Sequence, residues 1–199
     1  MNSKFFSAKN VALLGILIAL VIVLQLFASA IPMFGVTLNF SLIPIALAGI
    51  MIGWLGGLIV GLSSGLIVFI TMAVLGGEPS TAYLFQASPV LLTLTCIGKT
   101  TLAGVASGLI YKLFSKSHFA VATSLSSLII PVVNTGVYML GIVLMKADVA
   151  EFLALSSSAS GVVFGVVFGM IWLNFVLEMA INTVFTPVIY RVVKIFDKR

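Results

Sequence analysis

Apolar runs long enough to cross a bilayer recur along the whole chain and leave little sequence between them. The first run, Val11 to Ile31, contains no charged residue, and a transmembrane helix needs about 20 mostly apolar residues. Of the 199 residues, 61% are hydrophobic and only 8% are charged, whereas soluble domains carry about 25% charged residues. Because so few charged side chains cannot cover a water-facing surface, the sequence predicts a polytopic membrane protein.

The residues that enzymes and metal sites need are scarce. Cys96 and His118 are the single cysteine and the single histidine, so neither a disulfide framework nor a cysteine or histidine metal cluster is expected within one chain. The sequence contains no Walker, HExxH or GxSxG motif. We therefore expect no enzyme activity, no ATP hydrolysis by this chain alone, no metal and no cofactor.

Hydropathy and turn residues predict an all-α bundle of six spans that forms one domain over residues 1–199. The first run is too long for the apolar part of a signal peptide, so it is interpreted as a true span. An extended segment is expected over 34–41, a tight turn over 53–57 and a polar loop over 76–88. The six predicted spans are 9–31, 42–53, 57–75, 89–114, 120–145 and 161–194.

The charged residues predict the orientation of these spans. An even number of spans puts both termini on one side, and that side then holds eight of the ten basic residues, against Lys146 alone on the other. By the positive-inside rule both termini are cytoplasmic. The basic residues follow the span ends rather than forming a patch, so nucleic acid is not an expected partner. The eight are Lys4, Lys9, Lys112, Lys116, Arg191, Lys194, Lys198 and Arg199.

Polar residues inside predicted spans are the best candidates for a site, because such groups are costly in a membrane. At 1.5 Å per residue, Lys99, Asn134 and Asn174 lie at similar depth, roughly 15–18 Å below the outer surface. Glu178 lies one turn deeper, and Asn174, Glu178 and Asn182 share one helix face. One interpretation is a Lys99–Glu178 ion pair with asparagines bonding between helices. The other is the floor of a pocket for a small polar solute.

The outer loops favour the pocket. The connection after the first span offers Thr37, Asn39 and Ser41, and the loop after the third offers Glu78, Tyr83, Phe85 and Gln86. A loop of this mixed aromatic and polar character could close over a cavity as a lid, although a plain solvated connector has the same composition. The candidate binding residues are Asn39, Tyr83, Gln86, Lys99, Asn134, Tyr138, Asn174 and Glu178.

A stripe of small residues runs down one face of the first span. Ala8, Ala12, Gly15 and Ala19 recur at helical spacing, and such stripes let helix backbones approach closely in lipid. The stripe fits either internal packing or docking of another membrane protein.

These features together resemble the substrate-binding S components of energy-coupling factor (ECF) vitamin importers, over essentially the full length. The resemblance rests on the six-span plan, the small-residue stripe and a set of local segments. Tryptophan at position 54 departs from the Gly-Pro of the common turn. The segments are Val36–Pro44, Gly49–Gly57, Ile97–Gly104, Pro131–Gly136 and Asn174–Glu178.

The resemblance implies a mechanism. An S component binds a vitamin in a pocket open to the outside, and its first span docks onto a transmembrane coupling subunit driven by two cytosolic ATPases. It is thought to topple in the bacterial plasma membrane and release the substrate inward.

A lone buried cation with amide and hydroxyl partners favours a small hydroxylated carboxylate, with pantothenate as the best guess. Riboflavin would be expected to need more aromatic stacking, and folate more than one basic group. Glu178 could instead bind a cationic or pyrimidine-like ligand. The alternative substrates are therefore riboflavin, folate, pyridoxine and hydroxymethylpyrimidine.

Proteins of other classes remain as alternatives. A small membrane assembly or structural protein would use the same polar residues as glue between helices. A channel would need polar residues along a whole pore, whereas here they stop about midway through the membrane.

Overall fold

The computed structural model describes residues 7–29, 39–116, 118–156 and 162–196, and within them every regular element is helical. Among these described residues, five helices are long and apolar enough to cross a membrane, and a shorter apolar helix accompanies them. The prediction of an all-α membrane bundle is confirmed. The predicted extended segment falls mostly on 30–38, outside the described residues.

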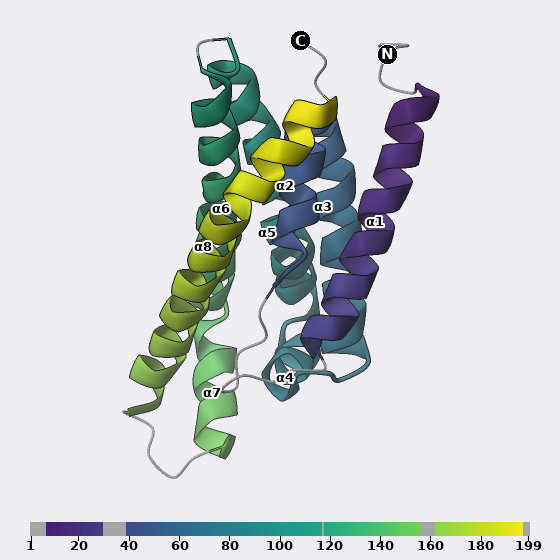
Figure 1. The fold of residues 1–199 in the computed structure, drawn as a ribbon. Helices are drawn as coiled ribbons and strands as arrows, with labels where there is room; N and C mark the ends of the chain where they lie inside the picture. Colours follow the sequence, from purple (N-terminus) through teal and green to yellow (C-terminus); the bar gives the residue numbers. More distant parts are fainter. Residues whose placement is uncertain (1–6, 30–38, 117, 157–161, 197–199) are drawn as a thin grey trace.

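The five long helices and the short helix α2 alternate in direction along the bundle (Figure 1). The start of α1 and the end of α8 lie at one end, which we call the terminal end, and α4 and α7 lie at the opposite, distal end. In chain order the elements are α1 (Ala8–Ser29), α2 (Leu42–Met51), α3 (Trp54–Val68) with its π-helical continuation η1 (Phe69–Val74), α4 (Pro79–Ala87), α5 (Pro89–Phe114), α6 (Phe119–Leu144), α7 (Lys146–Ser156) and α8 (Val162–Phe196).

Two short helices lie in connections between predicted spans. The segment expected to be a polar loop contains α4, with Pro79 in its first turn, where a missing N–H is harmless. The connection after α6 forms α7, with Asp148 in its first turn. The tight turn is also shorter than predicted, because α3 begins at Trp54, directly after Gly53 at φ +93°. That conformation is accessible to glycine at little cost.

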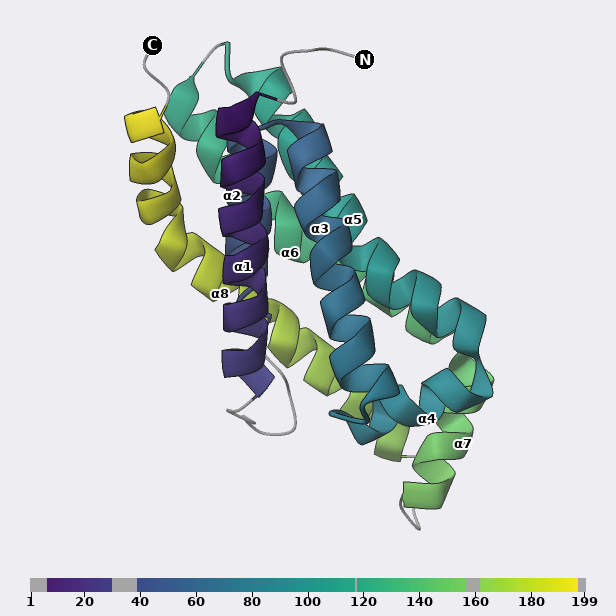
Figure 2. The ribbon, with the colours of Figure 1, turned by 90° about the vertical axis from the view of Figure 1, so that its right-hand side faces the viewer.

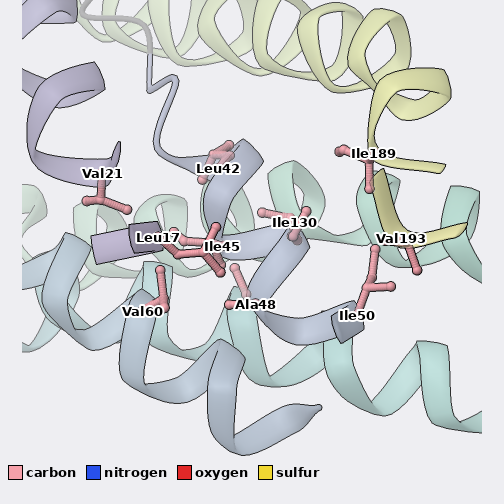
Figure 3. Packing of buried hydrophobic residues seen from close by; sticks show 12 residues of the cluster. Leu17, Val21, Leu42, Ile45, Ala48, Ile50, Val60, Ile130, Ile189 and Val193 are labelled. Carbon is pink, nitrogen blue, oxygen red and sulfur yellow. The ribbon is translucent and has the colours of Figure 1, made fainter. Parts of the chain in front are cut away.

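The short helix α2 lies in the middle of the bundle and contacts α1, α3, α5, α6 and α8. Its buried side chains, among them Leu42, Ile45 and Ile50, form the centre of an apolar cluster near the terminal half (Figure 3). Leu17 of α1 and Ile130 of α6 belong to the same cluster and pack around these α2 side chains. A second apolar cluster, around Leu92, Cys96 and Ile142, lies towards α4 and α7.

Helices α3 and α5 pack side by side through glycine (Figure 2). Gly57 and Gly104 face each other so closely that a Cβ added to either would lie 2.1 Å from the carbonyl oxygen of the other. One turn along, Gly61 approaches Thr100 in the same way, and the Thr100 hydroxyl donates to the Gly61 carbonyl at 2.8 Å. We call this contact the glycine seam. Small residues allow such close backbone approach inside membranes, and the seam fixes the position of α5.

Candidate functional site

Polar side chains separate the two apolar clusters on three helices. On α5, Lys99 lies between Cys96 of the distal cluster and Ala103 of the terminal-half cluster. On α6, Asn134 lies in the same way between Ile142 and Ile130. Asn174, Glu178 and Asn182 occupy the corresponding stretch of α8, between Ile171 and Ile189. These residues of α5, α6 and α8 therefore form a polar layer inside the bundle, between the two apolar clusters.

Glu178 is the centre of this layer and is 2% exposed. Asn134 Nδ2 donates to its Oε2 at 3.3 Å, and Asn174 Nδ2 donates to its Oε1 at 3.2 Å. The backbone N–H of Asn39 also lies within hydrogen-bonding reach of the carboxylate. Asn182 donates instead to the backbone carbonyl of Glu178, at 2.9 Å. The carboxylate thus receives hydrogen bonds from α6 and from its own helix α8, and the backbone N–H of Asn39 lies close to it.

The same hydrogen bonds turn the amide oxygens of the two asparagines away from Glu178. Asn134 Oδ1 and Asn174 Oδ1 are buried, and within the described part of the chain neither has a hydrogen-bond partner. An unpaired buried acceptor costs about 1–3 kcal/mol. Two such acceptors beside one carboxylate make a surface suited to a solute that carries hydroxyl or N–H donors.

Lys99 comes close to this cluster without pairing to it. Its Nζ lies 4.7 Å from the centre of the Tyr138 ring, a distance at which the ring face attracts a cation. The Glu178 carboxylate is near enough to interact electrostatically with Lys99, but no carboxylate of the described residues lies within 4.0 Å of its Nζ. The direct Lys99–Glu178 ion pair considered from the sequence is therefore not formed.

Two serines that the site prediction left out hold Asn39 in place. The Ser41 hydroxyl donates to Asn39 Oδ1 and also pairs with the Ser64 hydroxyl at 2.7 Å. Ser41 and Ser64 are both fully buried. The signal that could have found Ser64 is a hydroxyl inside an otherwise apolar span, the same signal that singled out the asparagines.

The candidates on α4 lie apart from this cluster. Tyr83 packs on Phe152 of α7, with ring centres 5.2 Å apart, and its hydroxyl lies within hydrogen-bonding reach of Glu151. Burial, followed by the charge of Glu151, raises the pKa of Tyr83 above its usual value. Gln86 is exposed. Ser88, at the end of α4, donates to Asp148 of α7 at 2.5 Å. The helices α4 and α7 therefore contact each other at the distal end and do not contribute to the polar layer.

The small-residue stripe of α1 faces away from the bundle. Ala8, Ala12, Gly15 and Ala19 are all exposed, and a Cβ built at Gly15 would meet no atom within 4 Å. The bundle side of α1 is a different face, which buries Leu17 and Val21 against the terminal-half cluster. Within the described chain, the stripe therefore has no packing role.

Comparison with known protein families identifies a family that matches most of the chain. A family model described as ECF transporter, substrate-specific component, matches residues 9–190. No curated protein matches the chain significantly, and no solved structure does. Since the family model covers nearly all of this multi-pass membrane protein, the chain belongs to the family of substrate-specific components of ECF transporters.

Proposed function

We propose that this chain captures a small water-soluble vitamin or vitamin precursor, and specifically pantothenate, and delivers it across the cell membrane. It does so together with a transmembrane coupling subunit and two cytosolic ATPases, which supply the energy. Both termini face the cytoplasm and the α4–α7 end faces outward, in agreement with the positive-inside bias. The family match supports the role of binding subunit in transport.

The observation that carries the choice of ligand is the pairing pattern of the polar layer. Pantothenate has one carboxylate, two hydroxyls and one amide N–H. Lys99, which has no carboxylate partner among the described residues, would bind the carboxylate, because charge-assisted hydrogen bonds are the strongest available there. The unpartnered oxygens of Asn134 and Asn174 would accept hydrogen bonds from the hydroxyls and the amide.

The direct test is mass spectrometry of small molecules that co-purify with the detergent-solubilised protein, followed by calorimetric titration. Pantothenate should bind more tightly than riboflavin, folate, pyridoxine or hydroxymethylpyrimidine. Tighter binding of a cationic or pyrimidine ligand, abolished by Glu178→Gln, would show that the carboxylate and not Lys99 selects the substrate. Failure of all five to bind would refute the vitamin assignment.

Replacement of Lys99 should weaken ligand binding strongly. We expect Lys99→Ala to raise the Kd for pantothenate at least 10-fold, about 1.4 kcal/mol, because the ligand carboxylate loses its cation. Lys112→Ala is the matched control, since Lys112 lies on the same helix but is exposed in its last turn. Calorimetric titration measures both. Unchanged affinity in Lys99→Ala, with the melting temperature intact, would remove Lys99 from the site.

The lid hypothesis concerns α4. If α4 and α7 close over bound ligand, a thiol probe should label Ser80→Cys several-fold more slowly in saturating pantothenate. Cys96 is 3% exposed, so it contributes little background. A cysteine at the exposed Lys116, at the terminal end, should label at one rate in both conditions. Equal labelling of Ser80→Cys with and without ligand would argue against a lid.

A further inference from the structure

A cavity of about 190 Å³ opens at the terminal end of the bundle, where α1, α2, α5 and α8 meet. It is lined by both apolar and polar side chains, and it is well separated along α5 from the polar layer around Lys99. We call it the terminal-end cleft. Its lining residues are Lys9, Asn10, Leu13, Ile50, Met51, Tyr111, Val193 and Phe196.

The electrostatics of the cleft favour an anion. Lys9 lies on its wall with Nζ 5.7 Å from the centre of the Phe196 ring. Lys112 follows Tyr111 directly, Arg191 precedes Val193 by two residues and Lys194 follows it directly; all three basic residues are exposed. The described carboxylates, by contrast, belong to Glu78, Asp148, Glu151 and Glu178, at the distal end or in the polar layer. The described residues at the terminal end therefore include several basic side chains and no carboxylate that would neutralise them.

The surroundings of the cleft favour a lipid over a soluble anion. The helix ends that form it carry exposed apolar side chains, with Val11 52%, Leu113 70% and Ile195 71% exposed. Such surfaces contact acyl chains. Basic pockets between transmembrane helices on the cytoplasmic side are suited to phospholipid head groups, since phosphate meets the cations while the chains stay in hydrocarbon.

We propose that the terminal-end cleft binds the phosphate head group of an anionic glycerophospholipid. Lys9 pairs with the phosphate, Lys112, Arg191 and Lys194 provide the surrounding positive potential, and the acyl chains lie along the apolar ends of α1, α5 and α8. This proposal does not depend on which vitamin the protein carries.

Native mass spectrometry of protein reconstituted in phosphatidylcholine nanodiscs with and without phosphatidylglycerol tests the site. We expect the wild type to retain phosphatidylglycerol selectively on release from the disc and to melt at a higher temperature when that lipid is present. Lys9→Gln should lower the retained phosphatidylglycerol about 10-fold, and Lys9→Arg should keep it. Lys116→Gln removes the same charge from the same end but outside the cleft lining, and should behave as the wild type does.

Three outcomes would overturn the proposal. Equal retention of phosphatidylcholine and phosphatidylglycerol would show that the cleft does not select an anion. Equal losses in Lys9→Gln and Lys116→Gln would show that the cationic end attracts anionic lipid without a site. Displacement of the lipid by millimolar glycerol 3-phosphate, with the same stabilisation of the protein, would identify a soluble phosphate as the ligand instead.

Discussion

Gly104→Ala is expected to lower the melting temperature of the purified protein far more than Gly98→Ala does. The added Cβ at Gly104 would lie 2.1 Å from the Gly57 carbonyl oxygen, so α3 and α5 must separate, whereas at Gly98 it would meet nothing within 4 Å. Overpacking of this kind costs about 1–3 kcal/mol. Alanine at Gly98 should be neutral or slightly stabilising, because it favours helix by about 1 kcal/mol.

Thermal unfolding in one detergent, followed by circular dichroism, measures both variants. They sit on the same helix and add the same single methyl group, so the comparison isolates the contact between α3 and α5. Equal melting shifts would mean that the two helices do not meet at Gly57 and Gly104.

Bulky substitutions on the α1 stripe should abolish transport without harming the isolated protein. Gly15 and Ala19 are exposed, and Gly15 has open space where a side chain would stand. We expect Gly15→Leu and Ala19→Trp to keep near-normal ligand binding and melting temperature. Transport, and co-purification with the coupling subunit, should be lost because the partner helix can no longer approach closely.

Val184→Trp is the matched control for the stripe. Val184 lies on α8 and is 72% exposed. Tryptophan at this position adds bulk to a lipid-facing surface of another helix and should leave transport intact. If binding and melting temperature collapse together in the α1 variants while the complex still assembles in proportion to folded protein, the docking assignment is wrong.

Hydropathy and charge predicted the fold class because each span needs a long apolar run, whatever it packs against. Helix α5, at Pro89–Phe114, coincides with a predicted span. The helices α4 and α7 are only 9 and 11 residues long and follow no strong hydrophobic period, so they were missed. The glycine seam was also missed, because a glycine in a sequence does not show which helix it faces.

The sequence predicted how deep in the membrane the candidate site residues lie, but not which of them contact one another. Residue counting along three spans predicted one depth for Lys99, Asn134 and Asn174, with Glu178 one turn deeper. The hydrogen bonds from Asn134 and Asn174 to Glu178 agree with that depth. Counting does not give the rotation of one helix relative to another. For this reason it allowed a Lys99–Glu178 pair, whereas the Lys99 ammonium lies over Tyr138. Tyr83 was assigned by composition alone, which does not distinguish a side chain that faces α7 from one that faces a pocket.

The short helix α2 has a consequence for biogenesis. Its 10 residues reach about 15 Å at 1.5 Å per residue, half of a hydrocarbon core of about 30 Å. The insertion machinery would find no full-length segment there, and the non-helical backbone of residues 39–41 would be left in lipid without protein around it. We therefore expect α1, α2 and α3 to leave the translocon together as one hairpin-like unit, and α2 to reach its final depth only when α5, α6 and α8 arrive.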